Sequence, residues 1–131
     1  MRYPLTTLAI VVNYHSAALT LGAVQSLLNA ESVGPLRVAV VDNSESEQEA
    51  AQLRAHLPPT VNLEINSRNE GFGRACNKAF ACDQSRAVLL LNPDARLLPT
   101  TLRCLQKTLY ATRNAAAVGP RLFWDESLEY Y

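Results

Sequence analysis

The stretch LLLNPDA at residues 89–95 decides the fold, because an apolar run ends in it at an amide, a proline and a carboxylate. Nothing polar interrupts residues 88–91, which predicts a strand buried on both faces. Pro93 has no N–H for a sheet ladder, so strand pairing is expected to stop there. Asn92 and Asp94 would then lie at the carboxyl end of a central strand, where open α/β sheets bind ligands. A carboxylate there is well placed to hold a hard divalent cation against a diphosphate. A plain strand exit followed by a turn accounts for this segment equally well.

Two earlier apolar runs end in the same manner. Residues 8–12 end at NY (residues 13–14), and residues 37–41 end at DNS (residues 42–44). Strands separated by helices form βαβ units with a mostly parallel sheet, which brings the carboxyl ends of the strands to one edge. The three polar clusters are therefore expected to converge, which favours a nucleotide-type pocket over a purely structural domain.

The segments between these strands have helical periodicity. Helices are expected from Ser16 to about Asn29, from a capping box at 44/47 or 46/49 to about His56, over residues 72–80, and over residues 100–112. The third helix has a stripe that is expected to face the core, made of Phe72, Ala75, Cys76, Ala79 and Phe80. Residues 61–65 alternate like an edge strand with one wet face, and residues 116–122 indicate one more short strand.

Composition bounds the possible functions. With 131 residues, 48% hydrophobic and 18% charged, the chain is expected to form one globular domain. Its 12 basic and 12 acidic side chains cancel, so no electrostatic footprint for nucleic acid or an anionic membrane is present. No apolar run approaches the length of a membrane span. The 3 cysteines lie in expected helices without metal-type spacing, which indicates reduced thiols packed as small core residues of a cytoplasmic protein.

Several common nucleotide and nucleophile motifs are missing. No glycine follows the first strand until Gly22, and the half fingerprint GFG at residues 71–73 has Cys76 where its third small residue should be. No Walker loop occurs. A phospho-receiver domain could use Asp42 or Asp94, but adjoining acids and a nearby lysine are not evident. Neither histidine is placed to activate a serine or cysteine nucleophile.

Four motifs in order resemble the family 2 glycosyltransferases. They are IVVNY (residues 10–14), VVDNS (40–44), NEGFGRACN (69–77) and LNPD (91–94), and VGPRL (118–122) also fits. The resemblance extends from residue 8 to about residue 122 and is strongest to the bacterial rhamnosyltransferase-like branch, which writes Asn-Pro-Asp in place of Asp-x-Asp. It implies a GT-A-type, Rossmann-like α/β fold, with an open, mostly parallel sheet flanked by helices. A nucleoside-diphosphate sugar would bind at the strand ends.

The resemblance implies roles for two residues at the first two strand ends. Tyr14 would stack on the base, and Asp42 would accept a hydrogen bond from the pyrimidine N3–H. Structural alternatives remain for both. Tyr14 could be a rim aromatic that covers the sheet edge, and Asp42 could cap the following turn through its side chain.

Residues 69–77 would, by the same resemblance, shape the floor of the nucleotide site. Asn69 and Gly71 belong to this floor, and Asn77 would hold neighbouring loops. Arg74 lies near enough to the loop to reach a phosphate, although a solvated helix position explains it as well. Gly71 could serve only to let the loop turn into the helix, and Asn77 could bond a loop carbonyl without touching ligand.

The resemblance assigns the metal to the third strand end. Asp94 would ligate Mg²⁺ or Mn²⁺ that bridges the diphosphate, with Asn92 as a neutral helper, because the leaving nucleoside diphosphate develops negative charge. One carboxylate and one amide do not form a dedicated cage, and Mg²⁺ prefers to keep water and substrate phosphates in its shell. Metal occupancy is therefore expected to depend on a bound nucleoside diphosphate.

No general base is evident. The acids downstream of Asp94 are Asp125, Glu126 and Glu129, which read as surface loop and receive no assignment. The chain is therefore expected to be the truncated, donor-binding half of a transferase. The complete enzyme would act on a sugar or lipid-linked acceptor in bacterial cell-surface polysaccharide synthesis, either cytoplasmic or peripheral to the membrane. An exposed sheet edge would favour homo-oligomers. The alternative is a non-catalytic α/β module that keeps the fold and binds nucleotide or a partner.

Overall fold

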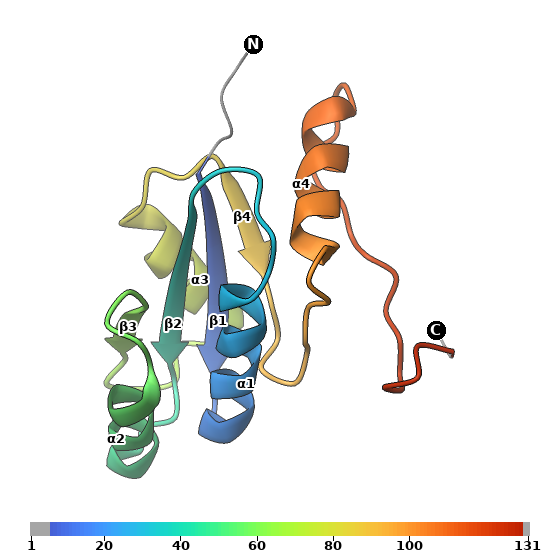
Figure 1. Ribbon diagram of the computed structural model, residues 1–131. Helices are drawn as coiled ribbons and strands as arrows, with labels where there is room; N and C mark the ends of the chain where they lie inside the picture. The colour runs from blue at the N-terminus through green and yellow to red at the C-terminus, as the bar shows by residue number, and fades with distance from the viewer. Residues whose placement is uncertain (1–5, 130–131) are drawn as a thin grey trace.

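A computed structural model describes residues 6–129 of the chain. Strands and helices alternate as β1 (Thr7–Asn13), α1 (Ala17–Leu28), β2 (Leu36–Asp42), α2 (Glu47–His56), β3 (Asn62–Ile65), α3 (Phe72–Ala81), β4 (Ala87–Leu90) and α4 (Thr101–Ala111). The strands form one parallel sheet in the order β3-β2-β1-β4 (Figure 1). The expected open, parallel α/β sheet is therefore confirmed, with helix bounds within about a residue of the predicted ones.

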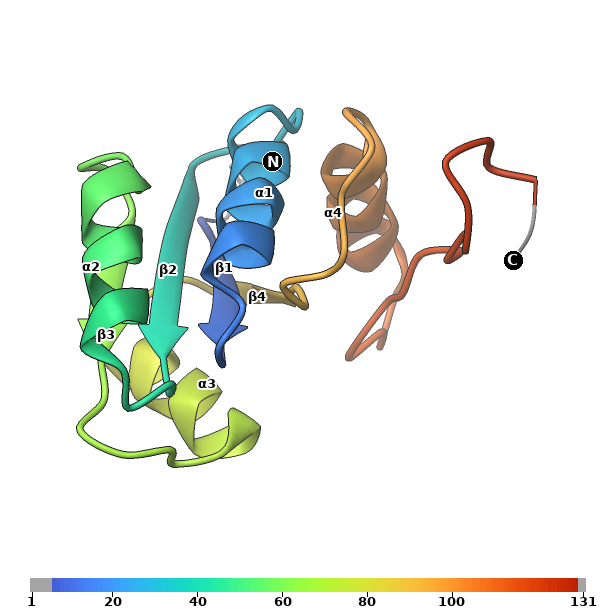
Figure 2. The ribbon, with the colours of Figure 1, turned by 90° about the horizontal axis from the view of Figure 1, so that it is seen from below.

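The sheet lies between two helical layers. Seen along the strands, α1, α2 and α4 lie on one side of the sheet and α3 on the other (Figure 2). Alternate residues of the central strand β1 serve the two layers. Ala9 and Val11 pack in the core cluster that includes α1, whereas Ile10 and Val12 pack in the cluster that includes α3. Because every residue of β1 is buried, its burial anchors both layers to one strand.

The N-terminus of α2 keeps half of its predicted capping box. Ser46 is the N-cap, and its hydroxyl accepts a hydrogen bond from the Glu49 N–H at 3.3 Å. The Glu49 carboxylate does not return to Ser46 but accepts from the Ala17 N–H, at the start of α1, at 2.9 Å. Ser44 takes no part as a cap, because its hydroxyl donates to Asp42. One carboxylate on α2 thus supports the start of α1, where the helix dipole favours negative charge.

The strand β4 is an edge strand, so the expectation of a central strand buried on both faces is wrong. In the register, Val88 and Leu90 lie beside Leu8 and Ile10, on the face of the sheet that α3 covers. That helix contacts β1 and β2, which leaves Val88 41% and Leu90 51% exposed. Leu91 follows β4 and is buried, and its N–H still bonds the Ile10 carbonyl at 3.1 Å.

The apolar stripe of α3 is narrower than predicted. On α3, Ala75, Cys76 and Ala79 are buried, but Phe72 is 50% and Phe80 45% exposed, because the helix covers only the two central strands. The expectation of core positions for all cysteines is also wrong, because Cys82 and Cys104 are exposed.

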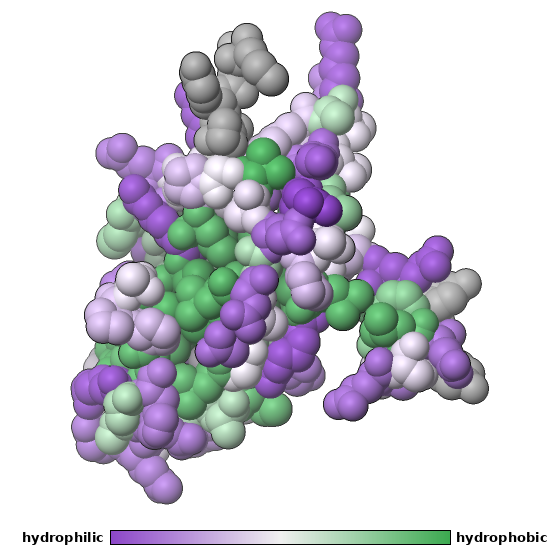
Figure 3. Space-filling view, viewed as in Figure 1, coloured by the Kyte–Doolittle hydropathy of each residue, from purple (hydrophilic) through white to green (hydrophobic). Residues whose placement is uncertain are grey.

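The segment after α4 is not a strand, contrary to the expectation for residues 116–122. It has no regular secondary structure and lies apart from the sheet, with hydrophobic surface of its own (Figures 1 and 3). Leu122 is 69% and Trp124 87% exposed. A strand forms only where a neighbour accepts its backbone hydrogen bonds, and the apolar pattern here found none within residues 6–129. Within residues 6–129, no helix is both long enough and apolar enough to cross a membrane.

Candidate functional site

The three polar clusters meet at the carboxyl edge of the sheet, as predicted. Asn13 at the end of β1 pairs in the register with Asp42 at the end of β2. Asn92 follows β4 on the other side of β1, after the Leu91 bond to Ile10. Figure 2 looks onto this edge. Asp42 and Asp94 are therefore on the same end of the sheet, on opposite sides of β1, as a shared site requires.

Asp42 is a buried carboxylate with two unlike oxygens. Its residue is 1% exposed. The Oδ1 atom accepts hydrogen bonds from Asn13 Nδ2 at 2.9 Å, Ser44 Oγ at 2.6 Å and the Ser44 N–H at 3.1 Å. The Oδ2 atom is buried and has no hydrogen-bond partner. The turn-capping role considered for Asp42 is therefore real, but it occupies only one oxygen.

The unpartnered oxygen has an energetic consequence. A buried acceptor without a donor costs roughly 1–3 kcal/mol, and more if it carries charge. Native structures rarely keep such an atom without a reason, such as a functional role or a bound water or ion. Because Oδ2 of Asp42 is shielded from solvent, a ligand donor reaches it only after the groups that cover it move.

A network of buried polar side chains holds Asp42 in place, and the sequence reasoning missed its centre. The Asn13 network consists of Asn13, Thr20, Asp42, Ser44 and Glu49. Besides Asp42, Asn13 Nδ2 lies 3.1 Å from Ser44 Oγ and 3.0 Å from Glu49 Oε2, and Asn13 Oδ1 accepts from Thr20 Oγ1 at 2.7 Å. Asn13 is fully buried, so it connects β1, β2, α1 and α2 rather than contacting ligand. Glu49 resembled an ordinary capping-box residue, and no local signal showed its second role.

Tyr14 lies at the open side of this network. It is 55% exposed, one residue beyond the end of β1. Its ring meets His15 edge-on, with ring centroids 4.6 Å apart and planes at 74°. His15 has a positive φ of 49°, and its N–H donates to Ser44 Oγ at 2.8 Å. The turn thus presents an aromatic face to solvent, which is suited to stacking on a base.

The loop before α3 is held to β2 by two amides that the sequence reasoning did not single out. Asn43 Nδ2 donates to the Gly71 carbonyl at 3.2 Å, and Asn66 Nδ2 donates to Asn43 Oδ1 at 2.7 Å. Gly71 has a φ of 81°, which side chains with a Cβ rarely adopt. Asn69 Oδ1 accepts from the Gly71 N–H at 2.9 Å, so both expected loop residues shape this turn.

Lys78 on α3 completes the contact with β3. Its Nζ donates to Asn66 Oδ1 and pairs with Glu64 Oε1, each at 2.7 Å. The hydrogen bond to Glu64 raises the pKa of Lys78 above its usual value. Arg74 and Asn77 are exposed on the same helix, and neither side chain makes a hydrogen bond or ion pair in the described part of the chain. Asn43 and Asn66, not Asn77, hold the loop here.

The Asn-Pro-Asp segment is exposed. Asn92 and Asp94 both face solvent, and the Ala95 N–H bonds the Asn92 carbonyl at 3.0 Å to close a turn. Within residues 6–129 no three His, Cys, Asp or Glu side chains come together as a metal cage. A lone carboxylate and an amide fit Mg²⁺ or Mn²⁺ that takes its remaining ligands from phosphate and water, and they do not fit a permanently held ion.

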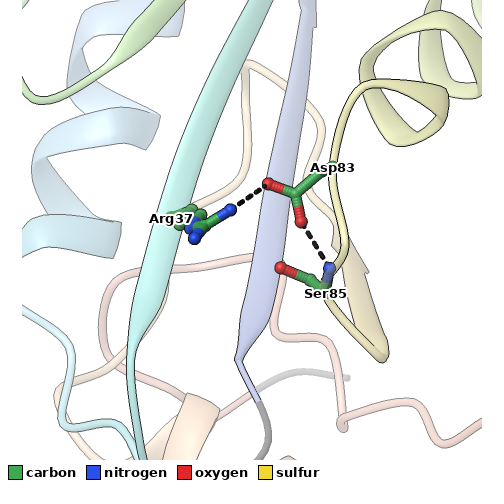
Figure 4. Close-up of polar contacts among 3 residues, drawn as sticks. All are labelled: Arg37, Asp83 and Ser85. Atoms are coloured by element: carbon green, nitrogen blue, oxygen red, sulfur yellow. Dashed lines mark hydrogen bonds and ion pairs between the residues drawn. The ribbon is translucent and has the colours of Figure 1, made fainter.

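A cavity of about 340 Å³ lies at the opposite, amino edge of the sheet, lined by residues that include Arg37, Asn62, Cys82 and Asp83. Arg37 Nη1 pairs there with Asp83 Oδ2 at 3.1 Å, and Asp83 Oδ1 accepts from the Ser85 N–H at 2.6 Å (Figure 4). Hydrogen bonding from Ser85, and then Arg37, lowers the pKa of Asp83 below its usual range despite partial burial. These contacts fasten the α3–β4 connection to the sheet, away from the three polar clusters.

Comparisons with known proteins agree with this architecture. The chain matches the model of glycosyl transferase family 2 over residues 8–131. A comparison with curated proteins returned no match. Among solved structures, the chain is similar to a mannosyltransferase, PcManGT, from Pyrobaculum calidifontis in complex with GDP-Man and Mn²⁺, with 22% identity and a TM-score of 0.62. The match covers 73% of this chain and 29% of the mannosyltransferase chain. This likeness establishes the GT-A type of fold.

Proposed function

We propose, because the chain belongs to glycosyl transferase family 2, that its carboxyl sheet edge binds a nucleoside-diphosphate sugar for glycosyl transfer. The observation that carries the proposal is the buried Asp42 Oδ2, which has no donor although Oδ1 has three. A base N–H would supply that donor. Tyr14, exposed one residue beyond the neighbouring strand, would stack on the base.

The remaining groups suit the diphosphate. Asn69 and Gly71 would form the floor beside the base, and Arg74 would reach a phosphate from its exposed position on α3. Asp94, helped by Asn92, would hold Mg²⁺ or Mn²⁺, which supplies positive charge against the leaving diphosphate. The mannosyltransferase of similar fold was solved with GDP-Man and Mn²⁺, so a purine donor belongs among the candidates beside the pyrimidine ones.

The finer assignment follows from the Asn-Pro-Asp motif. We place the chain in the rhamnosyltransferase-like branch, acting on a sugar or lipid-linked acceptor in bacterial cell-surface polysaccharide synthesis, in the cytoplasm or at the membrane surface. Asp125, Glu126 and Glu129 receive no catalytic role, because they lie in the C-terminal segment that stands apart from the sheet (Figure 1). The general base for transfer is thus assigned to no residue of this chain.

An exposed β4 supports a second, non-catalytic role. Val88 and Leu90 leave the edge strand with an apolar face and free backbone groups on its outer side. Such an edge pairs readily with another chain, so association of two copies through β4 is the specific alternative for this module. Sedimentation of the wild type and Leu90→Lys would test it, and a monomeric wild type would end it.

Calorimetric titration tests the main proposal. The chain is titrated with UDP, dTDP and GDP, each with and without Mn²⁺. Metal-dependent binding of one diphosphate is expected. Absence of heat with all three diphosphates would instead support the non-catalytic module.

A further inference from the structure

Arg96 lies across α1 at a position that only glycine leaves open. A Cβ built on Gly22 would meet the Arg96 guanidinium at 2.3 Å from Nη2, 2.8 Å from Cζ and 2.9 Å from Nε. Gly22 is inside α1, where alanine is the better helix former. A glycine that local preference disfavours thus makes room for a guanidinium from a segment more than 70 residues later.

The same guanidinium holds the turn that contains Asp94. Arg96 Nη1 donates to both the Pro93 and the Ala95 carbonyls, each at 2.7 Å. These carbonyls flank Asp94 in the chain. Bonds from a charged donor are stronger than neutral ones, and two bonds from one nitrogen restrict the peptides on both sides of the aspartate.

Backbone atoms of the segment that follows bind α1 and the loop after α1. The Leu97 N–H donates to Ser26 Oγ at 3.2 Å, and the Pro99 carbonyl accepts from the Glu31 N–H at 2.8 Å. These bonds fix the path of residues 97–99 but contact no group next to Asp94. The Ala95 side chain packs against the core cluster that includes α1, but among the hydrogen bonds of the described residues only those of Arg96 reach the carbonyls on either side of Asp94.

The arrangement also keeps the guanidinium off the aspartate. Arg96 and Asp94 form no ion pair in residues 6–129, although they are two positions apart. With its nitrogens over Gly22 and on the carbonyls, Arg96 leaves the Asp94 carboxylate free for a cation.

We propose that Arg96, held over Gly22, is a positioning residue that orients Asp94 toward a diphosphate-bound divalent cation. This inference rests on the proposed function. Groups that orient a metal ligand typically change metal affinity 10- to 100-fold when removed. An unclamped turn would present Asp94 in many orientations, and a released guanidinium would compete with the cation.

Two variants test the contact from its two sides. Arg96→Ala removes the donor, whereas Gly22→Ala displaces it by the added Cβ and improves helix propensity. For each, hydrogen exchange of the amides in residues 92–97 and the Mn²⁺-dependent part of diphosphate affinity are measured. We expect faster exchange at Ala95 and about tenfold weaker Mn²⁺-dependent affinity. The melting temperature of Gly22→Ala should not fall, because the displaced group is the flexible end of a side chain.

The double variant and a control sharpen the test. When Gly22→Ala is added to Arg96→Ala, amide exchange at Ala95 and Mn²⁺-dependent affinity should not change further, because both substitutions remove the same contact. Gly119→Ala is the matched control, since its Cβ would meet nothing within 4 Å. Unchanged exchange in both single variants would overturn the contact, and faster exchange with unchanged affinity would overturn the positioning role. If the wild type has no Mn²⁺-dependent affinity, the proposed function fails, while exchange still decides whether Arg96 holds the turn.

Discussion

Asp42 is the last residue of β2 and Asp94 follows β4 in the same parallel sheet, yet Asp42 is 1% exposed and Asp94 faces solvent. The Asn13 network saturates one oxygen of Asp42 and buries the other without a donor. The Asp94 turn has no such network around its carboxylate: Arg96 binds the carbonyls on either side of it, the Ala95 N–H bonds the Asn92 carbonyl, and Ala95 packs against the core. The difference teaches that folding fixes the position of the Asp42 carboxylate on the base side of the proposed site, although the groups that cover Oδ2 must still move for a ligand. On the proposed metal side, the site would be completed only by a bound diphosphate.

The strongest test of this contrast compares two amides at the same edge. Asn13→Ala removes every hydrogen bond of the buried side-chain amide, including the one from Thr20 and the one to Asp42. We expect the free energy of unfolding to fall by about 3 kcal/mol. Asn92→Ala changes an exposed amide and should stay within about 0.5 kcal/mol of wild type. Urea unfolding of both variants measures these free energies. Equal losses of stability in the two variants would contradict the contrast between a buried and an exposed amide.

The second test concerns the unpartnered oxygen. Asp42→Asn can keep the bonds to Oδ1 but replaces the buried acceptor Oδ2 by an amide NH2, which donates hydrogen bonds and does not accept them. Diphosphate affinity should fall by about 2 kcal/mol, or roughly 30-fold, because a charge-assisted hydrogen bond to the base is lost. Stability should change much less than affinity, because Oδ2 makes no hydrogen bond in the folded protein that the substitution could remove. Calorimetry and thermal melting are measured on the same samples. Unchanged affinity would contradict the role of Asp42.

The third test addresses the exposed side. Asp94→Asn should abolish the Mn²⁺-dependent part of diphosphate affinity altogether and leave the affinity without metal unchanged. The melting temperature should not change, since the side chain faces solvent. Equal Mn²⁺ dependence in wild type and variant would show that another group is the ligand. A large loss of thermal stability would show instead that Asp94 is a structural cap.

The smallest effect is expected at the opposite edge of the sheet. The folded-state pKa of Asp83 lies below its unfolded value, so its contacts with Ser85 and Arg37 stabilise the fold above about pH 4. This contribution is lost as pH falls through the folded pKa. Arg37 is largely exposed, so Asp83→Asn should reduce stability at neutral pH by less than about 1 kcal/mol and flatten the acid limb. Unfolding measured from pH 2 to pH 7 tests this, and an unchanged acid limb would contradict it.

Local sequence patterns predicted much of the architecture. The apolar runs before Asn13 and Asp42 predicted β1 and β2, and their polar ends predicted the functional edge. The failures share one cause, since burial depends on which helix covers which strand. Val88 and Leu90 read as core but lie beyond the reach of α3. Residues 116–122, predicted as a strand, pair with no strand of the sheet within residues 6–129.

By itself, the sequence determined the parallel α/β alternation and the order of the polar strand ends, because periodicity and proline act on neighbouring residues. Only the tertiary structure decided what each polar group does there. Asn13 is buried and bonds side chains from other elements, including Glu49. The Glu49 carboxylate accepts from the first residue of α1 instead of completing a capping box, and the Arg96 guanidinium lies against Gly22. Each of these contacts joins residues far apart in the chain. A contact of that kind depends on distances between residues that are set only after the helices have packed on the sheet.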